Sequence, residues 1–161
     1  MSPTLRAIDL VDGDALHAIF TEPGVKQFLF DDVAPSRDET QAHVEAACTH
    51  DGWVIDLDGV TVGFASLRPV DAADRELVIV VSERCWGRGV AFAAAQAALG
   101  HGFAALGLDR ILATVDLPNE RSHRLMRRLG FVRTGESDGP MYRATNYILM
   151  RPGTPSAAIT S

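Results

Sequence analysis

The sequence is poor in cysteine, in lysine and in positive charge. Its 161 residues include two cysteines, Cys48 and Cys85, which are too few for a disulfide framework and predict free thiols in a reducing cytoplasm. Lys26 is the sole lysine, and a P-loop requires a lysine directly after its second glycine, so a P-loop nucleotide site is excluded. The formal net charge is −6 at pH 7, whereas proteins that bind nucleic-acid phosphates are basic, so we expect no nucleic-acid partner.

Targeting signals, membrane spans and metal motifs are also scarce. The first residues hold no basic patch followed by an apolar run, so we expect no secretory signal. The apolar stretch 89–108 is built on alanine and glycine and is interrupted by Gln96 and His101, which favours a buried core helix and no membrane contact. None of the five histidines has a second ligand at metal-binding spacing, so we predict no metal site.

The composition is that of one globular domain. Hydrophobic residues make up 47% of the chain and charged residues 22%, an ordinary balance for a folded domain. We expect a single domain over residues 1–152, followed by a disordered tail over 153–161.

Hydrophobic periodicity predicts an α+β (mixed α/β) fold with the order β-α-α-β-β-β-α-β-α-β-β. Asp12 or Asp14 is expected to cap the first helix, and a capping box of Ser36 and Glu39 is expected to open the second. The predicted strands are 4–10, 53–57, 60–66, 76–81, 110–116, 131–136 and 141–150, with a two-residue turn at positions 58–59. The predicted helices end near positions 21, 49, 107 and 130, and residues 25–32 are a short helix or a loop.

Chemistry is first suggested by the loop after strand 76–81. Arg84 is followed by Gly87 and Gly89, and the loop opens the alanine-rich helix. A helix N-terminus carries unpaired N–H groups and a partial positive charge, and glycines let an anion approach the backbone. Two glycines alone are also typical of a tight turn with no ligand, so both interpretations stay open at this point. Two further glycines, Gly100 and Gly102, lie inside the helix at a cost of ~1 kcal/mol each relative to alanine.

Two blocks of sequence resemble one enzyme family. Residues 76–91, Glu-Leu-Val-Ile-Val-Val-Ser-Glu-Arg-Cys-Trp-Gly-Arg-Gly-Val-Ala, resemble the acetyl-CoA-binding motif of the GNAT N-acetyltransferase superfamily, Arg/Gln-x-x-Gly-x-Gly/Ala. Residues 119–131, Asn-x-x-Ser-x-x-Leu-x-x-x-Leu-Gly-Phe, are similar to the signature of its RimJ/RimL-like branch, which includes spermidine acetyltransferases. The resemblance covers about residues 3–151 and implies the GNAT fold, a central mixed and mostly antiparallel sheet flanked by helices. It also implies that two adjacent parallel strands, here ending near Val81 and Asp116, splay apart and leave a slot for the thioester.

The resemblance implies where acetyl-CoA binds. The pantetheine arm would lie along the central strand, the pyrophosphate on the amides of the glycine loop, and the 3′-phosphate near arginines of the last helix. Those arginines are otherwise a solvated face, and Asn119 is otherwise a plain helix cap. The implied cofactor-binding residues are Val80, Val81, Ser82, Arg84, Gly87, Arg88, Gly89, Val90, Ala91, Asn119, Ser122 and Arg124.

The resemblance also implies a catalytic apparatus. Glu76 matches the strand acid that acts as a base, usually through water, although a cross-strand partner of Arg75 or Arg68 is an equal alternative for it. The motif suggests a backbone N–H near Val81 as the donor to the oxyanion. Many relatives carry a tyrosine acid where this chain has Met126, so Ser122 is our candidate acid, with Tyr142 next and Tyr147 after it. The alternative for Ser122 is a hydrogen bond to its own helix.

These inferences predict a cytoplasmic N-acetyltransferase that moves the acetyl group of acetyl-CoA to a primary amine of a small molecule or a protein N-terminus. The alternative is a catalytically inactive CoA or acyl-CoA sensor, which only Met126 supports. A generic nucleotide-binding domain is a weaker third interpretation. Homodimers are common in the family, so a homodimer is left open.

Overall fold

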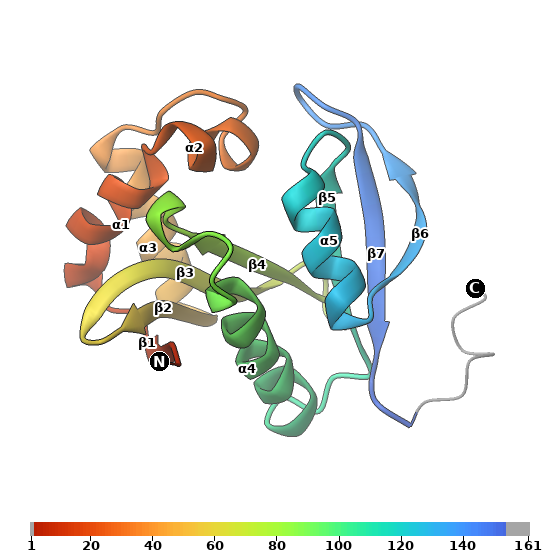
Figure 1. Ribbon diagram of the computed structural model, residues 1–161. Coiled ribbons are helices and arrows are strands. Elements are labelled where there is room, and N and C mark those ends of the chain that lie inside the picture. Colours follow the sequence, from red (N-terminus) through yellow and green to blue (C-terminus); the bar gives the residue numbers. More distant parts are fainter. Residues whose placement is uncertain (1, 154–161) are drawn as a thin grey trace.

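The computed structural model describes residues 2–153, so the tail expected over 153–161 lies outside the described residues except for Gly153. The strands are β1 (Thr4–Ala7), β2 (Asp51–Leu57), β3 (Val60–Pro69), β4 (Arg75–Val81), β5 (Arg110–Asp116), β6 (Val132–Ser137) and β7 (Ala144–Met150). The helices are α1 (Gly13–Phe20), α2 (Pro23–Leu29), α3 (Arg37–Cys48), α4 (Val90–Ala104) and α5 (Glu120–Leu129), with 3-10 turns η1 (Leu10–Asp12) and η2 (Glu83–Cys85). The predicted order is confirmed, and α2 occupies the segment left open as helix or loop (Figure 1).

The strands form one sheet in the order β1-β2-β3-β4-β5-β7-β6. Neighbouring strands are antiparallel except β4 and β5, which are parallel, so the mixed and mostly antiparallel sheet is confirmed. These two central strands share a single registered pair, Glu76 with Leu112, although each is seven residues long. The sheet is therefore continuous on either side of a split at its centre.

The helices cover opposite faces of the sheet. Leu16 of α1 and Val44 of α3 pack in one core with Val80 of β4. Ala95 of α4 and Met126 of α5 pack in another core, on the other face. That second core also contains Leu77, Ile111, Ala113 and Val115. Because side chains alternate along a strand, even-numbered residues of β4 and β5 face α1–α3, and odd-numbered ones face α4 and α5.

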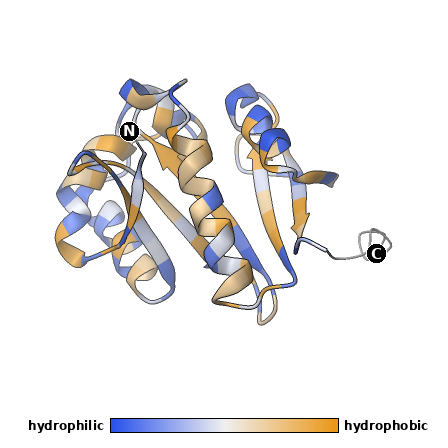
Figure 2. Cartoon of the chain, turned by 60° about the horizontal axis from the view of Figure 1, so that its bottom comes forward, coloured by the Kyte–Doolittle hydropathy of each residue, from blue (hydrophilic) through white to orange (hydrophobic). Residues whose placement is uncertain are grey.

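The alanine-rich helix α4 packs close to the sheet and is apolar almost throughout (Figure 2). A Cβ on Gly102 would lie 2.9 Å from side-chain atoms of both Ile111 and Leu67, so this glycine permits the close approach. A Cβ on Gly100 would meet nothing within 4 Å, and the structure offers no reason for that glycine.

Local signals at the element ends predicted the positions of caps and turns. The Ser36–Glu39 capping box is confirmed, and both turn residues at positions 58–59 have the positive φ that a two-residue hairpin turn needs. Asp12 stands at the N-cap position of α1, as expected, but its side chain makes no cap hydrogen bond to that helix. The Asp12 carboxylate instead completes a capping box with Asp9, which caps η1, because the chain makes a 3-10 turn before α1 begins.

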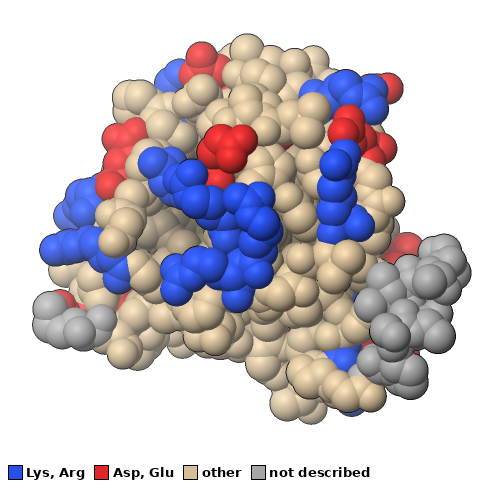
Figure 3. Space-filling view, turned by 45° about the vertical axis from the view of Figure 1, so that its right-hand side comes forward, with Lys and Arg blue, Asp and Glu red and all other residues tan. Residues whose placement is uncertain are grey.

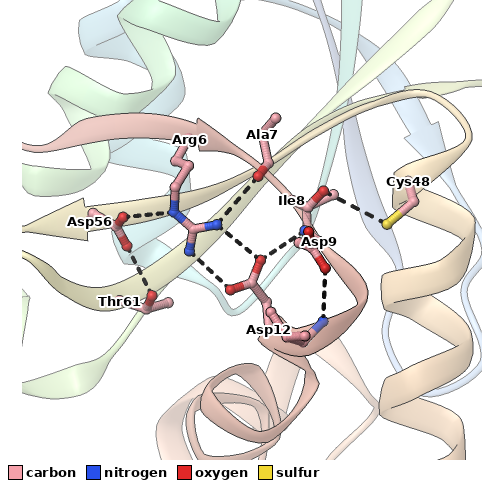
Figure 4. Close-up of polar contacts among 9 residues, drawn as sticks. Arg6, Ala7, Ile8, Asp9, Asp12, Cys48, Asp56 and Thr61 are labelled. Carbon is pink, nitrogen blue, oxygen red and sulfur yellow. Dashed lines mark hydrogen bonds and ion pairs between the residues drawn. The ribbon is translucent and has the colours of Figure 1, made fainter.

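The corner between β1 and α1 is held by an ion-pair network (Figure 4). Arg6 donates to Asp12 at 2.9 and 3.3 Å and to Asp56 of β2 at 3.1 Å. Asp12 also accepts the Asp9 amide at 2.8 Å, and Asp56 accepts the Thr61 hydroxyl at 2.9 Å. The edge strand is thereby tied both to the next strand and to the first helix.

Candidate active site

The split between β4 and β5 opens into a cleft of about 760 Å³. Its walls come from both faces of the sheet. Phe28 of α2 and His43 of α3 line it on one side, and Phe92 of α4 and Arg124 of α5 on the other. A ligand in this cleft can therefore be approached by a second molecule from the opposite face.

The main chain of β4 presents unpaired amides to the cleft. The Ser82 N–H donates to the Val62 carbonyl at 2.8 Å, and the Val80 carbonyl lies so close to Gly63 of β3 that a Cβ there would meet it at 2.2 Å. Since N–H and C=O directions alternate along a strand, the amides of Ile79 and Val81 point toward β5, beyond the single pair that the two strands share. An extended ligand arm can pair with these amides like an added strand.

The glycine loop leaves the start of α4 open. Gly87 and Gly89 have φ values of 73° and 77°, which disfavour residues with a Cβ, and open space surrounds both. Gly89 is the N-cap of α4 and supplies no side-chain cap, so the N–H groups of Val90 and Ala91 remain available beside the cleft. This uncapped helix start fits a diphosphate, because unpaired backbone N–H groups at a helix N-terminus bind phosphate oxygens.

Arginines of α5 line the same end of the cleft. They are Arg121, Arg124 and Arg128. The Arg121 guanidinium lies 3.5 Å from the ring centre of Trp86, and that of Arg128 lies 4.3 Å from the ring centre of Phe92. Figure 3 shows Lys and Arg side chains gathered beside a hollow on this face of the molecule. Arg84 and Arg88 lie apart from the cleft and line a pocket of about 270 Å³ against the β2–β3 hairpin.

The loop after β4 is fastened to α2 by two glutamates that sequence reasoning missed. The buried Ser82 hydroxyl and the Glu83 N–H each donate to the Glu22 carboxylate at 2.7 Å. The Gly24 N–H in turn donates to the Glu83 carboxylate. No local signal could have revealed Glu22, because its partners lie 60 and 61 positions away.

Glu76 lines the cleft at its closed end, where β4 and β5 still pair. Its carboxylate is 3.0 Å from the guanidinium of Arg68, so the expected cross-strand partner is confirmed as Arg68. Arg75 pairs with Asp51 instead. The Glu76 side chain keeps 18% of its surface exposed and is part of the cleft lining.

The remaining candidate residues separate into two groups. Asn119 and Ser122 line the cleft, and Asn119 is confirmed as an N-cap because its Oδ1 accepts the Ser122 N–H at 3.3 Å. Tyr142 precedes β7, since that strand begins at Ala144 rather than at 141, and its ring centre lies 5.5 Å from that of Phe28. Tyr147 is buried and bonds through its hydroxyl to Nδ1 of His123 at 2.7 Å.

Asp116, at the end of β5, is a cleft residue that sequence reasoning missed. Burial raises the pKa of its carboxyl above the ordinary value, and the nearby Asp31 carboxylate adds to the shift. His123 holds the turn behind it, because Nε2 donates to the carbonyls of Asp116 at 3.1 Å and Leu117 at 3.0 Å. The available signal was an acidic residue that ends a strand three positions before a helix cap.

Residues 2–153 hold neither a metal-binding cluster nor a membrane-spanning helix. Within that range no group of three or more potential ligands (His, Cys, Asp or Glu) is placed to hold a metal ion. In the same range no helix has both the length and the apolar character to cross a membrane.

Comparisons with known proteins agree with this geometry. The acetyltransferase (GNAT) domain family matches residues 4–132. The chain is 27% identical over 146 residues to spermidine N(1)-acetyltransferase of Escherichia coli K12, a match that covers 84% of this chain and 75% of the relative. Its fold is similar to a GNAT-family acetyltransferase from Bacillus anthracis, with a TM-score of 0.84 and 23% identity over 94% of this chain and 96% of that one.

A third similar protein was solved with ligands. It is the spermidine N-acetyltransferase from Vibrio cholerae in complex with CoA and spermine, with a TM-score of 0.79 and 21% identity over 93% of this chain and 96% of that one. The family match spans most of the chain, and the split sheet and glycine loop stand where the two sequence motifs placed them. The chain belongs to the GNAT acetyltransferase family and is an acetyl-CoA-dependent N-acetyltransferase.

Proposed function

We propose that the protein acetylates a primary amine, on a small molecule or at a protein N-terminus, by direct attack of the amine on the thioester of acetyl-CoA. The observation that carries this proposal is the split between β4 and β5, with unpaired strand amides inside it and an uncapped helix start at its rim. Donor and acceptor can enter such a cleft from opposite faces of the sheet and meet within it.

The donor side is the face covered by α4 and α5. The amide of Val81, the nearer of the two to the start of α4, would pair with the pantetheine arm, and those of Val90 and Ala91 would hold the pyrophosphate. Arg124, with its neighbours on α5, would meet the 3′-phosphate, because guanidinium groups bind phosphate through paired hydrogen bonds. Arg84 and Arg88 face the β2–β3 hairpin, so we infer that they contribute positive electrostatic potential around the glycine loop rather than a direct contact.

The chemistry requires two proton transfers. The neutral amine attacks the carbonyl carbon, the carbon–nitrogen bond forms, and the carbon–sulfur bond breaks. We assign Glu76 as the base that takes the proton from the amine nitrogen, through water, and the N–H of Ile79, two residues before Val81 on the Glu76 side, as donor to the carbonyl oxygen as it gains charge. Ser122 would protonate the departing thiolate, and Tyr142 is the second candidate for that role.

The acceptor side is the face covered by α1–α3. Phe28 and His43 line the cleft there, and the related enzyme of Escherichia coli acts on spermidine, which supports a small-molecule amine as the acceptor. We place the enzyme in the cytoplasm, in keeping with Cys48 and Cys85 as free thiols. A homodimer stays a prediction, which light scattering on the purified protein checks.

The decisive experiment measures release of free thiol from acetyl-CoA in the presence of a panel of amines. We expect turnover with at least one amine, and we expect Glu76→Gln to lower kcat by about 100-fold, within the range of general base catalysis. Glu45→Gln on the exposed side of α3 is the matched control and should leave kcat unchanged. CoA binding without thiol release for any amine would favour the sensor alternative, and full activity of Glu76→Gln would remove Glu76 as the base.

A further inference from the structure

The two faces of the cleft differ in charge. On the face of α4 and α5 the lining carries three arginines from α5. On the face of α1–α3 the charged lining consists of Arg68 with its partner Glu76, and of Asp116. Over residues 2–153 the Asp116 carboxylate makes no hydrogen bond and no ion pair, so it is the lining carboxylate that the described chain leaves without a cation.

Asp116 lies at a defined place relative to the reacting end of the cleft. Leu112, the partner of Glu76, is four residues before Asp116 on the same strand and faces the same side. At 3.3 Å per residue, Asp116 stands about 13 Å along the strand from the level of Glu76. The two carboxylates therefore occupy opposite ends of one wall, with Glu76 at the closed end and Asp116 at the open end.

The surroundings of Asp116 suit a bound cation. The carboxylate is half-buried, and burial together with the neighbouring Asp31 raises the pKa of the group, so its ionised form is disfavoured in the absence of a positive partner. Asp31 itself is half-buried in a tight turn with φ of 52°, which Lys26 fixes by donating to the carbonyl and the carboxylate of Asp32. An ammonium group bound at Asp116 would offset the repulsion from Asp31.

We propose that Asp116 binds a second ammonium group of the acceptor, one that is not acetylated, and thereby makes the enzyme select diamines and polyamines over monoamines. The inference rests on the proposed function and adds a specificity-determining residue to it. The distance along β5 requires an acceptor whose two nitrogens are separated by several methylene groups. Phe28 lines the cleft on the same face and offers an apolar surface to that chain.

The test compares acceptors and variants in parallel. The acceptors are α,ω-diamines and monoamines of equal chain length, and the variant is Asp116→Asn, which keeps the backbone carbonyl that His123 binds. Asp109→Asn is the matched control, because Asp109 is exposed and directly precedes the opposite end of the same strand. We expect Asp116→Asn to raise KM for the diamine about 10-fold or more, as loss of a charge-assisted contact does, with kcat and the monoamine kinetics changed less than about threefold.

A binding measurement separates this inference from the proposed function. Calorimetric titration of the diamine into the protein with CoA present should show the same loss of affinity in Asp116→Asn, whether or not turnover occurs. Asp116→Glu keeps the charge and should retain the preference for diamines. An unchanged diamine KM and affinity in Asp116→Asn, or equal losses for diamines and monoamines, would overturn the proposal, whereas absent thiol release with intact diamine binding would overturn only the proposed function.

Discussion

The corner where β1 meets α1 and the split between β4 and β5 both gather charged side chains, but they differ in how those charges are matched. At the corner, Arg6 donates hydrogen bonds to the carboxylates of Asp12 and Asp56, and Asp12 also accepts a hydrogen bond from a backbone N–H (Figure 4). At the split, Asp116 has no cationic partner in residues 2–153, and the amides of Ile79 and Val81 have no partner strand. Buried polar groups are normally satisfied within the protein, so groups left open in a cleft are candidates for ligand contacts.

The same contrast appears in the pKa values. Burial alone would raise the pKa of the Asp12 carboxyl, but hydrogen bonds from Arg6 and from the Asp9 amide bring it below its ordinary value. Burial also raises the pKa of Asp116, and there a second carboxylate adds to the shift. The pKa of buried Asp12 is thus lowered by the partners that the chain provides. The pKa of half-buried Asp116 is raised, because the chain provides it with no such partner.

The largest effect on stability is expected from removing Arg6 from the ion-pair network at the β1–α1 corner. Arg6→Ala would leave the Asp12 carboxylate buried with its backbone amide as the remaining partner, which should lower the free energy of unfolding by about 1–3 kcal/mol. Urea denaturation measures that loss. CoA affinity should not change, because the corner lies outside the cleft. A parallel loss of CoA binding in a folded variant would contradict the separation between the two regions.

The next effect compares two glycines with nearly equal φ values. Gly89 at the start of α4 has φ of 77°, Gly59 in the β2–β3 hairpin has φ of 79°, and a Cβ added to either glycine would meet nothing within 4 Å. Alanine at either position should cost about 1–2 kcal/mol of stability, because the left-handed region is unfavourable for residues with a Cβ. Gly89→Ala should also weaken CoA binding about 10-fold by displacing loop amides.

Gly59→Ala serves as the control for that change. Isothermal titration with CoA should give the wild-type affinity for this variant despite the same backbone strain. Equal CoA affinities for the two variants would show that the loop conformation of Gly89 does not contribute to binding.

The contrast also explains how much the sequence could predict. The order of elements, the Ser36 capping box and the hairpin turn depend on neighbours within a few residues, and they were predicted correctly. The glycine loop and Asn119 were found by motif, since their spacing is local as well. The Asp9 cap was missed because a 3-10 turn before a helix has the same composition as a first helical turn.

The parts that could not be predicted depend on contacts between distant segments. Glu22 reaches Ser82 across 60 positions, and the importance of Asp116 depends on β5 lying beside β4 and parting from it. The Glu22 contact has no local trace in the sequence, whereas the parting of the two strands near Val81 and Asp116 was implied by the family resemblance and not by the residues themselves. The sequence likewise left open whether Arg75 or Arg68 pairs with Glu76. The register of β3 and β4 answers this, because it sets Arg68 opposite Glu76.

The smallest expected effect is the pH dependence of stability at Asp116 and Asp12. Because the folded-state pKa of Asp116 is raised, its ionised form destabilises the fold, so Asp116→Asn should increase the free energy of unfolding at pH 7 by less than about 1 kcal/mol. That gain should vanish as the pH falls through the raised pKa toward the ordinary value of 3.8. Asp12→Asn should do the opposite, because a lowered pKa contributes stability above the ordinary value that is lost as the pH falls through the folded-state pKa.

Thermal unfolding of both variants and the wild type between about pH 7 and pH 3.5 measures these differences. At pH 7 the two substitutions should shift the unfolding temperature in opposite directions, and both differences should shrink with acidification. If Asp116→Asn lowers stability at pH 7, the Asp116 carboxylate has a stabilising partner inside the folded chain. Asp116 would then resemble Asp12, whose charge is balanced by partners within the protein, rather than a group left open for a ligand.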